Sequence, residues 1–136
     1  LLAVLTTRRK RSRGGKRADL GGQFFRSRWE ANYARYLEFL RGRKIIESWA
    51  YEEKEFWFEG IERGTRSYLP DFRVTWDSGT IEYHEVKGYM DATSRTKLAR
   101  MAKYHPTVKV RVIDAAWFRS ANRNIAPLIP HWERGA

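Results

Sequence analysis

The chain has 136 residues, enough for one domain with a hydrophobic core, and 42% of its residues are hydrophobic. It contains 27 Lys and Arg residues against 16 Asp and Glu residues, so its formal net charge at pH 7 is +11. The absence of cysteine excludes disulfide bonds and thiolate metal sites, and no apolar stretch is long enough to span a bilayer. Such a charge favours a nucleic acid as the partner, ahead of an anionic membrane.

Much of the positive charge lies in one short segment near the amino end. Residues 8–17 include seven Lys and Arg residues and no acid, which leaves +4 for the rest of the chain. Like-charge repulsion and the pair Gly14-Gly15 predict a flexible basic arm over residues 1–22. We expect this arm to contact nucleic-acid phosphates without sequence preference. Its candidate binding residues are Arg8, Arg9, Lys10, Arg11, Arg13, Lys16 and Arg17.

The first predicted elements after the arm are a helix and two short strands. Ser27 is the expected cap of a helix over residues 28–40, in which aromatic and leucine side chains recur at helical spacing. Strand-like alternation then covers residues 44–51 and 54–58. The segment 60–66, which carries charges of both signs, is expected to be a loop.

Two further strands, over residues 69–76 and 81–88, are joined by the predicted turn Asp77-Ser78-Gly79. A second helix over residues 95–104 ends where proline follows His105, and a last strand covers residues 108–113.

This order predicts an α/β fold, with one domain in which a central mixed β-sheet is flanked by helices. We expect the domain to cover residues 23–120, followed by a C-terminal extension over residues 121–136. Most of the tryptophans are expected in its core, namely Trp49, Trp57, Trp76 and Trp117.

Three charged residues on the two central strands form a candidate catalytic site. Side chains alternate between the faces of a strand, so Glu85 and Lys87 share one face, and Asp71 stands at the start of the neighbouring strand. Glu30, in the first turn of the preceding helix, is a fourth candidate because that helix is expected to pack across the sheet. Two carboxylates beside an ammonium group indicate a hard-metal site with an adjacent cation.

The chemistry of this site points to magnesium and a phosphodiester. Asp71 and Glu85 would supply carboxylate ligands, with Glu30 and the backbone carbonyl of Val86 as further oxygen ligands. The metal would polarise a phosphoryl oxygen and lower the pKa of bound water. Lys87 would orient or deprotonate that water, or neutralise charge in the transition state.

The motif Pro70-Asp71, then Glu85-Val86-Lys87, with Glu30 on the helix before them, resembles the PD-(D/E)XK nuclease superfamily. The resemblance covers roughly residues 26–113. Within the superfamily, the chain is similar to small phage-type endonucleases, to the endonuclease subunit of cut-and-paste transposons and, more distantly, to archaeal Holliday-junction resolvases.

The resemblance implies a restriction-endonuclease-like core and a DNA phosphodiesterase that depends on Mg²⁺, for which Mn²⁺ substitutes. It implies that Asp71 and Glu85 bind the metal, that Lys87 is the catalytic lysine and that Glu30 is the helix carboxylate. Lys97 matches a basic position near the DNA. A phage-type protein would act in the cytoplasm of a bacterial host cell.

Tyr89 and the histidines lie outside this motif. Tyr89 follows Gly88 beside the proposed site and is a candidate to stack on a sugar or an unpaired base. His84 lies on the opposite strand face from Glu85, which favours a packing role, and His105 is expected to end a helix. No histidine has a partner at metal-ligand spacing, which argues against zinc.

Three functions are compatible with these features. The first is a metal-dependent DNA endonuclease that selects branched or junction DNA by shape, since no base-reading module is visible. Cutting both strands of a duplex requires two sites, which a homodimer would provide. The second is a nucleic-acid-binding module without catalysis. The third is an endonuclease subunit of a larger recombination or transposition complex.

Overall fold

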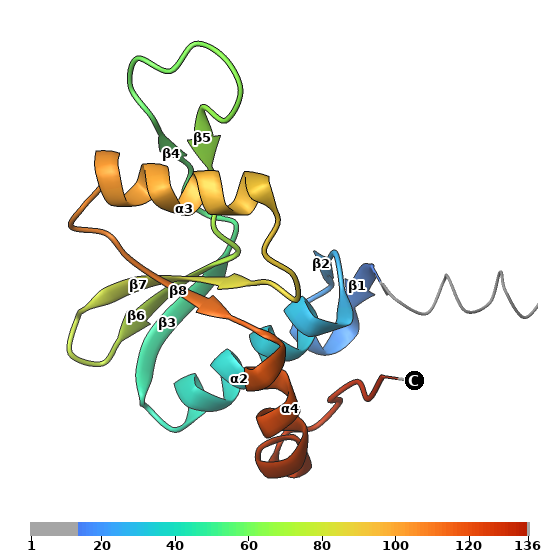
Figure 1. The fold of residues 1–136 in the computed structure, drawn as a ribbon. Coiled ribbons are helices and arrows are strands. Elements are labelled where there is room, and N and C mark those ends of the chain that lie inside the picture. The colour runs from blue at the N-terminus through green and yellow to red at the C-terminus, as the bar shows by residue number, and fades with distance from the viewer. Residues whose placement is uncertain (1–13, 136) are drawn as a thin grey trace, which may run out of the picture.

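A mixed four-stranded sheet lies at the centre of the computed structural model, which describes residues 14–135 (Figure 1). Its strands are β3 (Ile46–Tyr51), β6 (Phe72–Trp76), β7 (Ile81–Val86) and β8 (Lys109–Ile113), in the order β3-β6-β7-β8. The first three strands pair antiparallel, and β8 pairs parallel to β7. The prediction of an α/β fold with a mixed central sheet is therefore confirmed.

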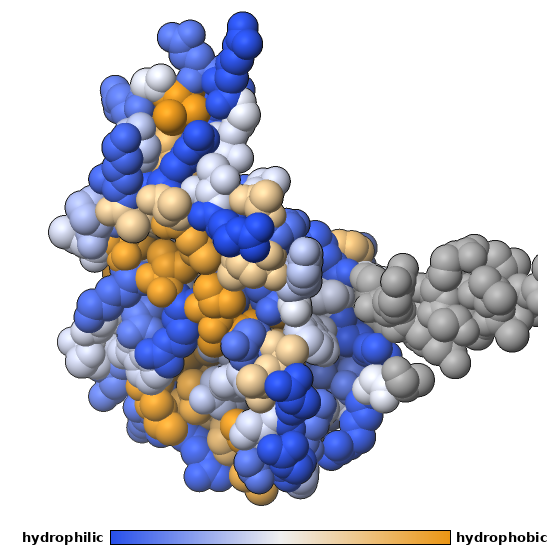
Figure 2. Space-filling view, viewed as in Figure 1, coloured by the Kyte–Doolittle hydropathy of each residue, from blue (hydrophilic) through white to orange (hydrophobic). Residues whose placement is uncertain are grey.

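Helices cover both faces of this sheet because its strands are apolar on both sides. On one face, α2 (Arg28–Gly42) and α4 (Ala115–Asn124) enclose the main core, to which the sheet contributes Phe72, Val74 and Val86. On the other face, α3 (Ala92–Tyr104) packs through Met101 and Tyr104 against a smaller cluster. Figure 2 shows apolar residues where the sheet crosses between α3 and α4 in this view.

Each helix begins at a side chain that accepts a hydrogen bond from the first turn. Ser27 accepts from the backbone N–H of Glu30 at 3.2 Å, Asp91 from Ser94 at 2.8 Å and Asp114 from Trp117 at 3.0 Å. These bonds satisfy amide groups that have no partner within the helix. Both predicted helices are present and are longer than expected, whereas α4 was not predicted.

Two short strands, β4 (Phe56–Trp57) and β5 (Ser67–Tyr68), form a separate hairpin that projects beyond α3 (Figure 1). Phe56 and Tyr68 pair across it and pack in the smaller cluster with Met101. Alternation turns Trp57 outward, and 58% of its surface is exposed. The prediction that Trp57 belongs to the core was wrong, because β4 is not part of the central sheet.

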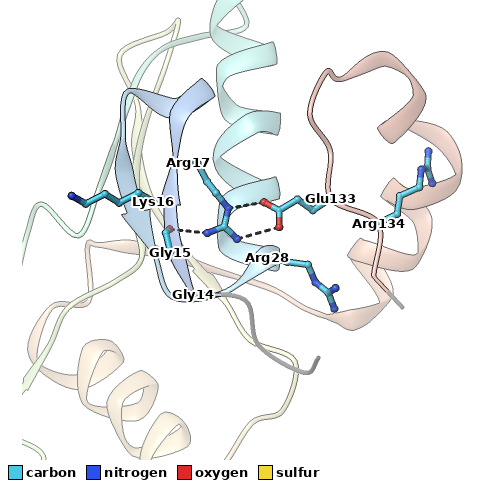
Figure 3. A pocket seen from close by; sticks show the side chains of 7 residues that line it. All are labelled: Gly14, Gly15, Lys16, Arg17, Arg28, Glu133 and Arg134. Atoms are coloured by element: carbon cyan, nitrogen blue, oxygen red, sulfur yellow. Dashed lines mark hydrogen bonds and ion pairs between the residues drawn. The ribbon is translucent and has the colours of Figure 1, made fainter. Parts of the chain in front are cut away.

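The amino end of the described chain is folded, which corrects part of the predicted flexible arm over residues 1–22. Residues 14–22 include β1 (Gly15–Arg17), paired antiparallel with β2 (Gln23–Phe25), and the 3₁₀ turn η1 (Ala18–Leu20) between them. Arg17 is held by Glu133, with 2.6 Å between Nε and Oε2 (Figure 3). Five arm residues lie outside the described residues, namely Arg8, Arg9, Lys10, Arg11 and Arg13.

The predicted extension over residues 121–136 contains the end of α4, the 3₁₀ turn η2 (Ala126–Leu128) and a tail that returns to α2. Asn32 and Glu133 exchange two hydrogen bonds of 2.9 Å. Arg35 binds Glu133 at 2.9 Å and Asp19 at 2.8 Å, so α2 links both ends of the described chain. Within residues 14–135, none of the helices combines the length and apolar character that a membrane span requires.

Candidate active site at one end of the sheet

The strand directions bring four chain segments to the same end of the sheet. β3, β7 and β8 end there, and β6 begins there, since Tyr51 pairs with Phe72 and Phe72 pairs with His84. Asp71 directly precedes β6, and Glu85 lies near the end of β7. The amino terminus of α2 reaches the same place, because Arg26, just before the helix, contacts Asp71.

Asp71 and Glu85 are held next to each other by hydrogen bonds between side chains and backbone amides. Asp71, with only 2% of its surface exposed, accepts a bond from the Val86 amide through Oδ2 at 2.8 Å. Glu85 accepts through Oε1 from the Asp71 amide at 3.3 Å and from the Tyr68 hydroxyl at 2.9 Å. The two predicted carboxylates are therefore adjacent and held from several sides.

Glu30 joins this pair through Arg26. The Nη2 atom of Arg26 lies 2.9 Å from Asp71 Oδ1 and 3.6 Å from Glu30 Oε2. Glu30 also accepts a bond from the Tyr51 hydroxyl at 2.5 Å and is almost fully buried. Arg26 makes a further ion pair with Glu52. The guanidinium thus binds carboxylates from α2, the end of β3 and the start of β6.

The carboxylates lie where negative charge is unfavourable. Burial, followed by the charges of Glu85 and Glu30, raises the pKa of Asp71 well above its usual range. Burial also raises the pKa of Glu85, opposed by the hydrogen bond from Tyr68 and by positive charge. A bound cation would relieve such repulsion. Two adjacent buried carboxylates therefore have the hard oxygen atoms and the charge that suit Mg²⁺.

No set of three or more Asp, Glu, His or Cys side chains within residues 14–135 is grouped closely enough to hold a metal ion. Glu30 and Asp71 both contact the Arg26 guanidinium. Asp71 and Glu85 are the adjacent pair among the predicted metal ligands, and metal binding by them and by Glu30 stays a prediction. The Val86 carbonyl as a further ligand stays a prediction.

Lys87 and Lys97 are both close enough to Glu85 for their charges to lower its pKa. Lys87 continues the face of β7 that carries Glu85, and its amide donates to Ile113 at 3.0 Å. Lys97 comes from α3. The two lysines therefore flank the carboxylates from different elements. Tyr89 is 78% exposed and is accessible to a ligand, while its stacking role stays a prediction.

Gly88 fits tightly against Trp29 at the side of the site. A Cβ atom at Gly88 would lie 3.0 Å from a Trp29 ring carbon, so only glycine allows this approach without a shift. Trp29 stacks on Phe118 of α4, with ring centroids 4.4 Å apart. A pocket of about 320 Å³ opens here, lined by Ser27, Arg28, Trp29, Val86 and Gly88.

A second, open pocket of about 570 Å³ shares Arg28 with the first one (Figure 3). Its basic side chains come from both ends of the described chain, and Lys16 points away from Arg28 (Figure 3). Arg17, predicted to bind DNA, is instead largely covered and paired with Glu133. Lys16 is exposed, in keeping with its predicted role.

Sequence reasoning missed four residues that contact the predicted set, namely Arg26, Tyr51, Glu52 and Tyr68. Arg26 is one cation in a basic chain, and no local pattern marks it. Glu52 is a non-glycine residue with a φ of 50°, a left-handed conformation that sequence does not reveal. Tyr68 lies before the predicted strand over residues 69–76, so strand alternation did not predict a contact between Tyr68 and Glu85. Tyr68 belongs to β5, which was not predicted as a strand, and this strand brings its hydroxyl to Glu85.

His84 is buried on the other face of β7, as predicted. Its Nδ1 lies 2.7 Å from the Tyr33 hydroxyl and its Nε2 lies 2.9 Å from Glu82. Burial lowers the pKa of His84, which favours the neutral ring and agrees with a packing role in the core. His105 caps the end of α3, as expected, and approaches the Trp57 carbonyl at 2.8 Å.

Comparisons of the chain with protein-family models, with curated proteins and with solved structures found no significant match.

Proposed function

We propose that the protein is a metal-dependent DNA endonuclease that hydrolyses phosphodiester bonds. The observation that carries this proposal is the adjacency of Asp71 and Glu85, with Lys87 on the same strand face, in a chain of net charge +11. Buried carboxylates repel a phosphate group unless a cation lies between the carboxylates and the phosphate. A surface that only binds phosphate would therefore be weakened by this pair.

When bound, Mg²⁺ supplies Lewis-acid polarisation of the phosphoryl oxygen and a lowered pKa of water. Asp71 and Glu85 are the residues that would hold it, with Glu30 as the third carboxylate. Tyr68 keeps Glu85 in place through its hydroxyl. Lys87 is placed beside Glu85, where an ammonium group orients the attacking water or offsets the charge of the transition state.

The reaction is a hydrolysis that needs no further reactant. The water oxygen forms a bond to phosphorus, the bond from phosphorus to one sugar oxygen breaks, and that oxygen takes up a proton. Basic residues such as Lys97 on α3 and Lys16 on β1 would then contact neighbouring phosphates. Phosphate contacts carry no sequence information directly, so we propose that the enzyme selects branched or junction DNA by its shape.

The test is cleavage of supercoiled plasmid and of a synthetic four-way junction, in Mg²⁺ and in excess chelator. We expect cleavage by the wild type with Mg²⁺ only, and losses of at least about a hundredfold in Asp71→Asn and Lys87→Gln. The matched controls are Asp77→Asn in the β6–β7 turn and Lys109→Gln on β8, which should cut normally. Equal cleavage by Asp71→Asn and wild type would show that the site assignment is wrong.

A binding module without catalysis is the second candidate, and one observation favours it. The Arg26 guanidinium forms ion pairs with Glu30, Glu52 and Asp71, as expected in a purely structural ion-pair network. In that case the protein would bind the four-way junction in a gel-shift assay but would not cut it in Mg²⁺ or in Mn²⁺. Asp71→Asn would then leave DNA affinity unchanged.

A further inference from the structure

Arg26 lies where a cation would be expected among the acidic residues of the candidate site. Its guanidinium forms ion pairs with Glu30, Glu52 and Asp71, and the contact with Asp71 Oδ1 is 2.9 Å. Glu30 is in α2, Glu52 follows β3 and Asp71 precedes β6. Three acidic side chains thus share one guanidinium.

The cluster around Arg26 is fixed by the backbone. Glu52 adopts a left-handed conformation, with φ of 50°, and its amide donates to the Asp71 carbonyl at 2.8 Å. A non-glycine residue holds that conformation only where its surroundings enforce it. The backbone of Arg26 is fixed too, because its amide donates to Glu30 at 3.2 Å.

The Arg26 side chain itself is accessible. It is 54% exposed, whereas the side chains of Asp71 and Glu30 are 3% and 10% exposed. It extends from the junction between β2 and α2, outside the regular hydrogen bonding of either element. A rotation of this side chain would carry the guanidinium towards solvent while the buried acids stay in place.

We propose that Arg26 is an internal counter-ion that competes with the divalent metal for the site and moves out to bind substrate phosphate. This inference rests on the proposed function, because it assigns a regulatory role within the same site. A guanidinium binds carboxylate and phosphate with the same planar set of donors, so a phosphodiester is a suitable second partner. DNA binding and metal binding are thereby coupled, since each withdraws Arg26 from the acids.

The test is a titration of the full chain with Mn²⁺, in which electron paramagnetic resonance measures the free ion. Arg26→Gln should bind Mn²⁺ at least about tenfold more tightly than wild type, because unit charges about 4 Å apart interact strongly near a protein surface. Arg26→Lys keeps the charge without the planar fork, and its affinity should be intermediate. Arg41→Gln is the matched control, since it removes an exposed ion pair with Glu38 and should bind like wild type.

The coupling is tested by repeating the titration with a short duplex that contains cleavage-resistant phosphorothioate linkages. The duplex should raise the Mn²⁺ affinity of the wild type more than that of Arg26→Gln, which has lost the competing group. Equal gains in the two proteins would contradict the coupling.

The outcomes also separate this proposal from the nuclease proposal. If Mn²⁺ binds to wild type and not to Asp71→Asn, while Arg26→Gln binds no more tightly than wild type, only the counter-ion role fails. If neither wild type nor Arg26→Gln shows saturable binding, both proposals fail. Thermal unfolding of each variant, monitored by circular dichroism, establishes that the titrated proteins are folded.

Discussion

Tyr68 connects the projecting β4–β5 hairpin to the acidic pair, because its hydroxyl donates to Glu85. Its ring remains buried among apolar side chains, so Tyr68→Phe removes the hydrogen bond and little else. We expect a loss of about tenfold to a hundredfold in Mn²⁺ affinity or cleavage rate, as for other residues that orient metal ligands. Tyr104→Phe in the same cluster is the control. Normal activity in Tyr68→Phe would mean that β7 alone orients Glu85.

Gly88 tests how closely the site is packed. In Gly88→Ala the added methyl group would lie 3.0 Å from the Trp29 ring, which stacks on Phe118, so the ring would have to shift out of this stacking. We expect the free energy of unfolding in urea to fall by about 1–3 kcal/mol. Gly42→Ala, where a Cβ atom meets no atom within 4 Å, should be neutral or slightly stabilising. Equal stability of the two variants would contradict this account.

Among single residues, those on regular strands and helices were the ones that sequence could place. Alternation put Glu85 and His84 on opposite faces of β7, and the folded chain agrees, because Glu85 binds Tyr68 and His84 binds Tyr33. Arg26 and Glu52 were missed because their importance comes from contacts between segments, which no local pattern encodes. Whether the site acts as the sequence resemblance implies stays a prediction.

At the scale of elements, the start of α2 positions Glu30. Ser27 caps this helix by accepting from the Glu30 amide at 3.2 Å. Ser27→Ala should lower the free energy of unfolding by about 1 kcal/mol, and Ser27→Thr, which retains a hydroxyl, should lose less. If Glu30 contributes to the site, Ser27→Ala should also reduce Mn²⁺ affinity. Unchanged stability in Ser27→Ala would show that packing alone sets the start of the helix.

The boundaries of elements with strong hydrophobic periodicity were predicted to within a few residues. Elements with a weak pattern, such as α4 and β1, were not predicted. The helix expected over residues 28–40 is Arg28–Gly42, and the last strand is Lys109–Ile113. α4 was missed although Asp114 carries a capping signal, because few apolar residues follow Trp117 and Phe118. β1 was missed because its charge and glycines favour a flexible arm, and its antiparallel partner β2 is only three residues long.

At the scale of the whole molecule, a network around Arg35 joins the two ends of the described chain to α2. Burial alone would raise the pKa of Glu133, but hydrogen bonds from Arg17 and Arg35 outweigh it and lower that pKa. A lowered pKa means that the folded state favours the charged form. The stability from Glu133 is therefore complete at neutral pH and is lost as the pH falls through the folded-state pKa.

This network predicts a stability difference that depends on pH. Glu133→Gln should lower the free energy of unfolding by about 1–3 kcal/mol at pH 7. The difference from wild type should shrink as the pH falls below about 4, where glutamate becomes protonated. Urea unfolding at both pH values measures it, and Glu62→Gln in the exposed loop is the control. A difference that does not change with pH would show that shape, and not charge, makes Glu133 important.

The contact between Trp29 and Gly88 gives the protein an optical reporter beside its candidate site. Indole emission responds to what surrounds the ring, and Trp29 lines the pocket of about 320 Å³ next to Val86. Subtracting the emission of Trp29→Phe from that of the wild type isolates this ring from the five other tryptophans. Added DNA should then change the difference spectrum, so entry of a nucleotide can be followed without radioactive or dye-labelled substrate.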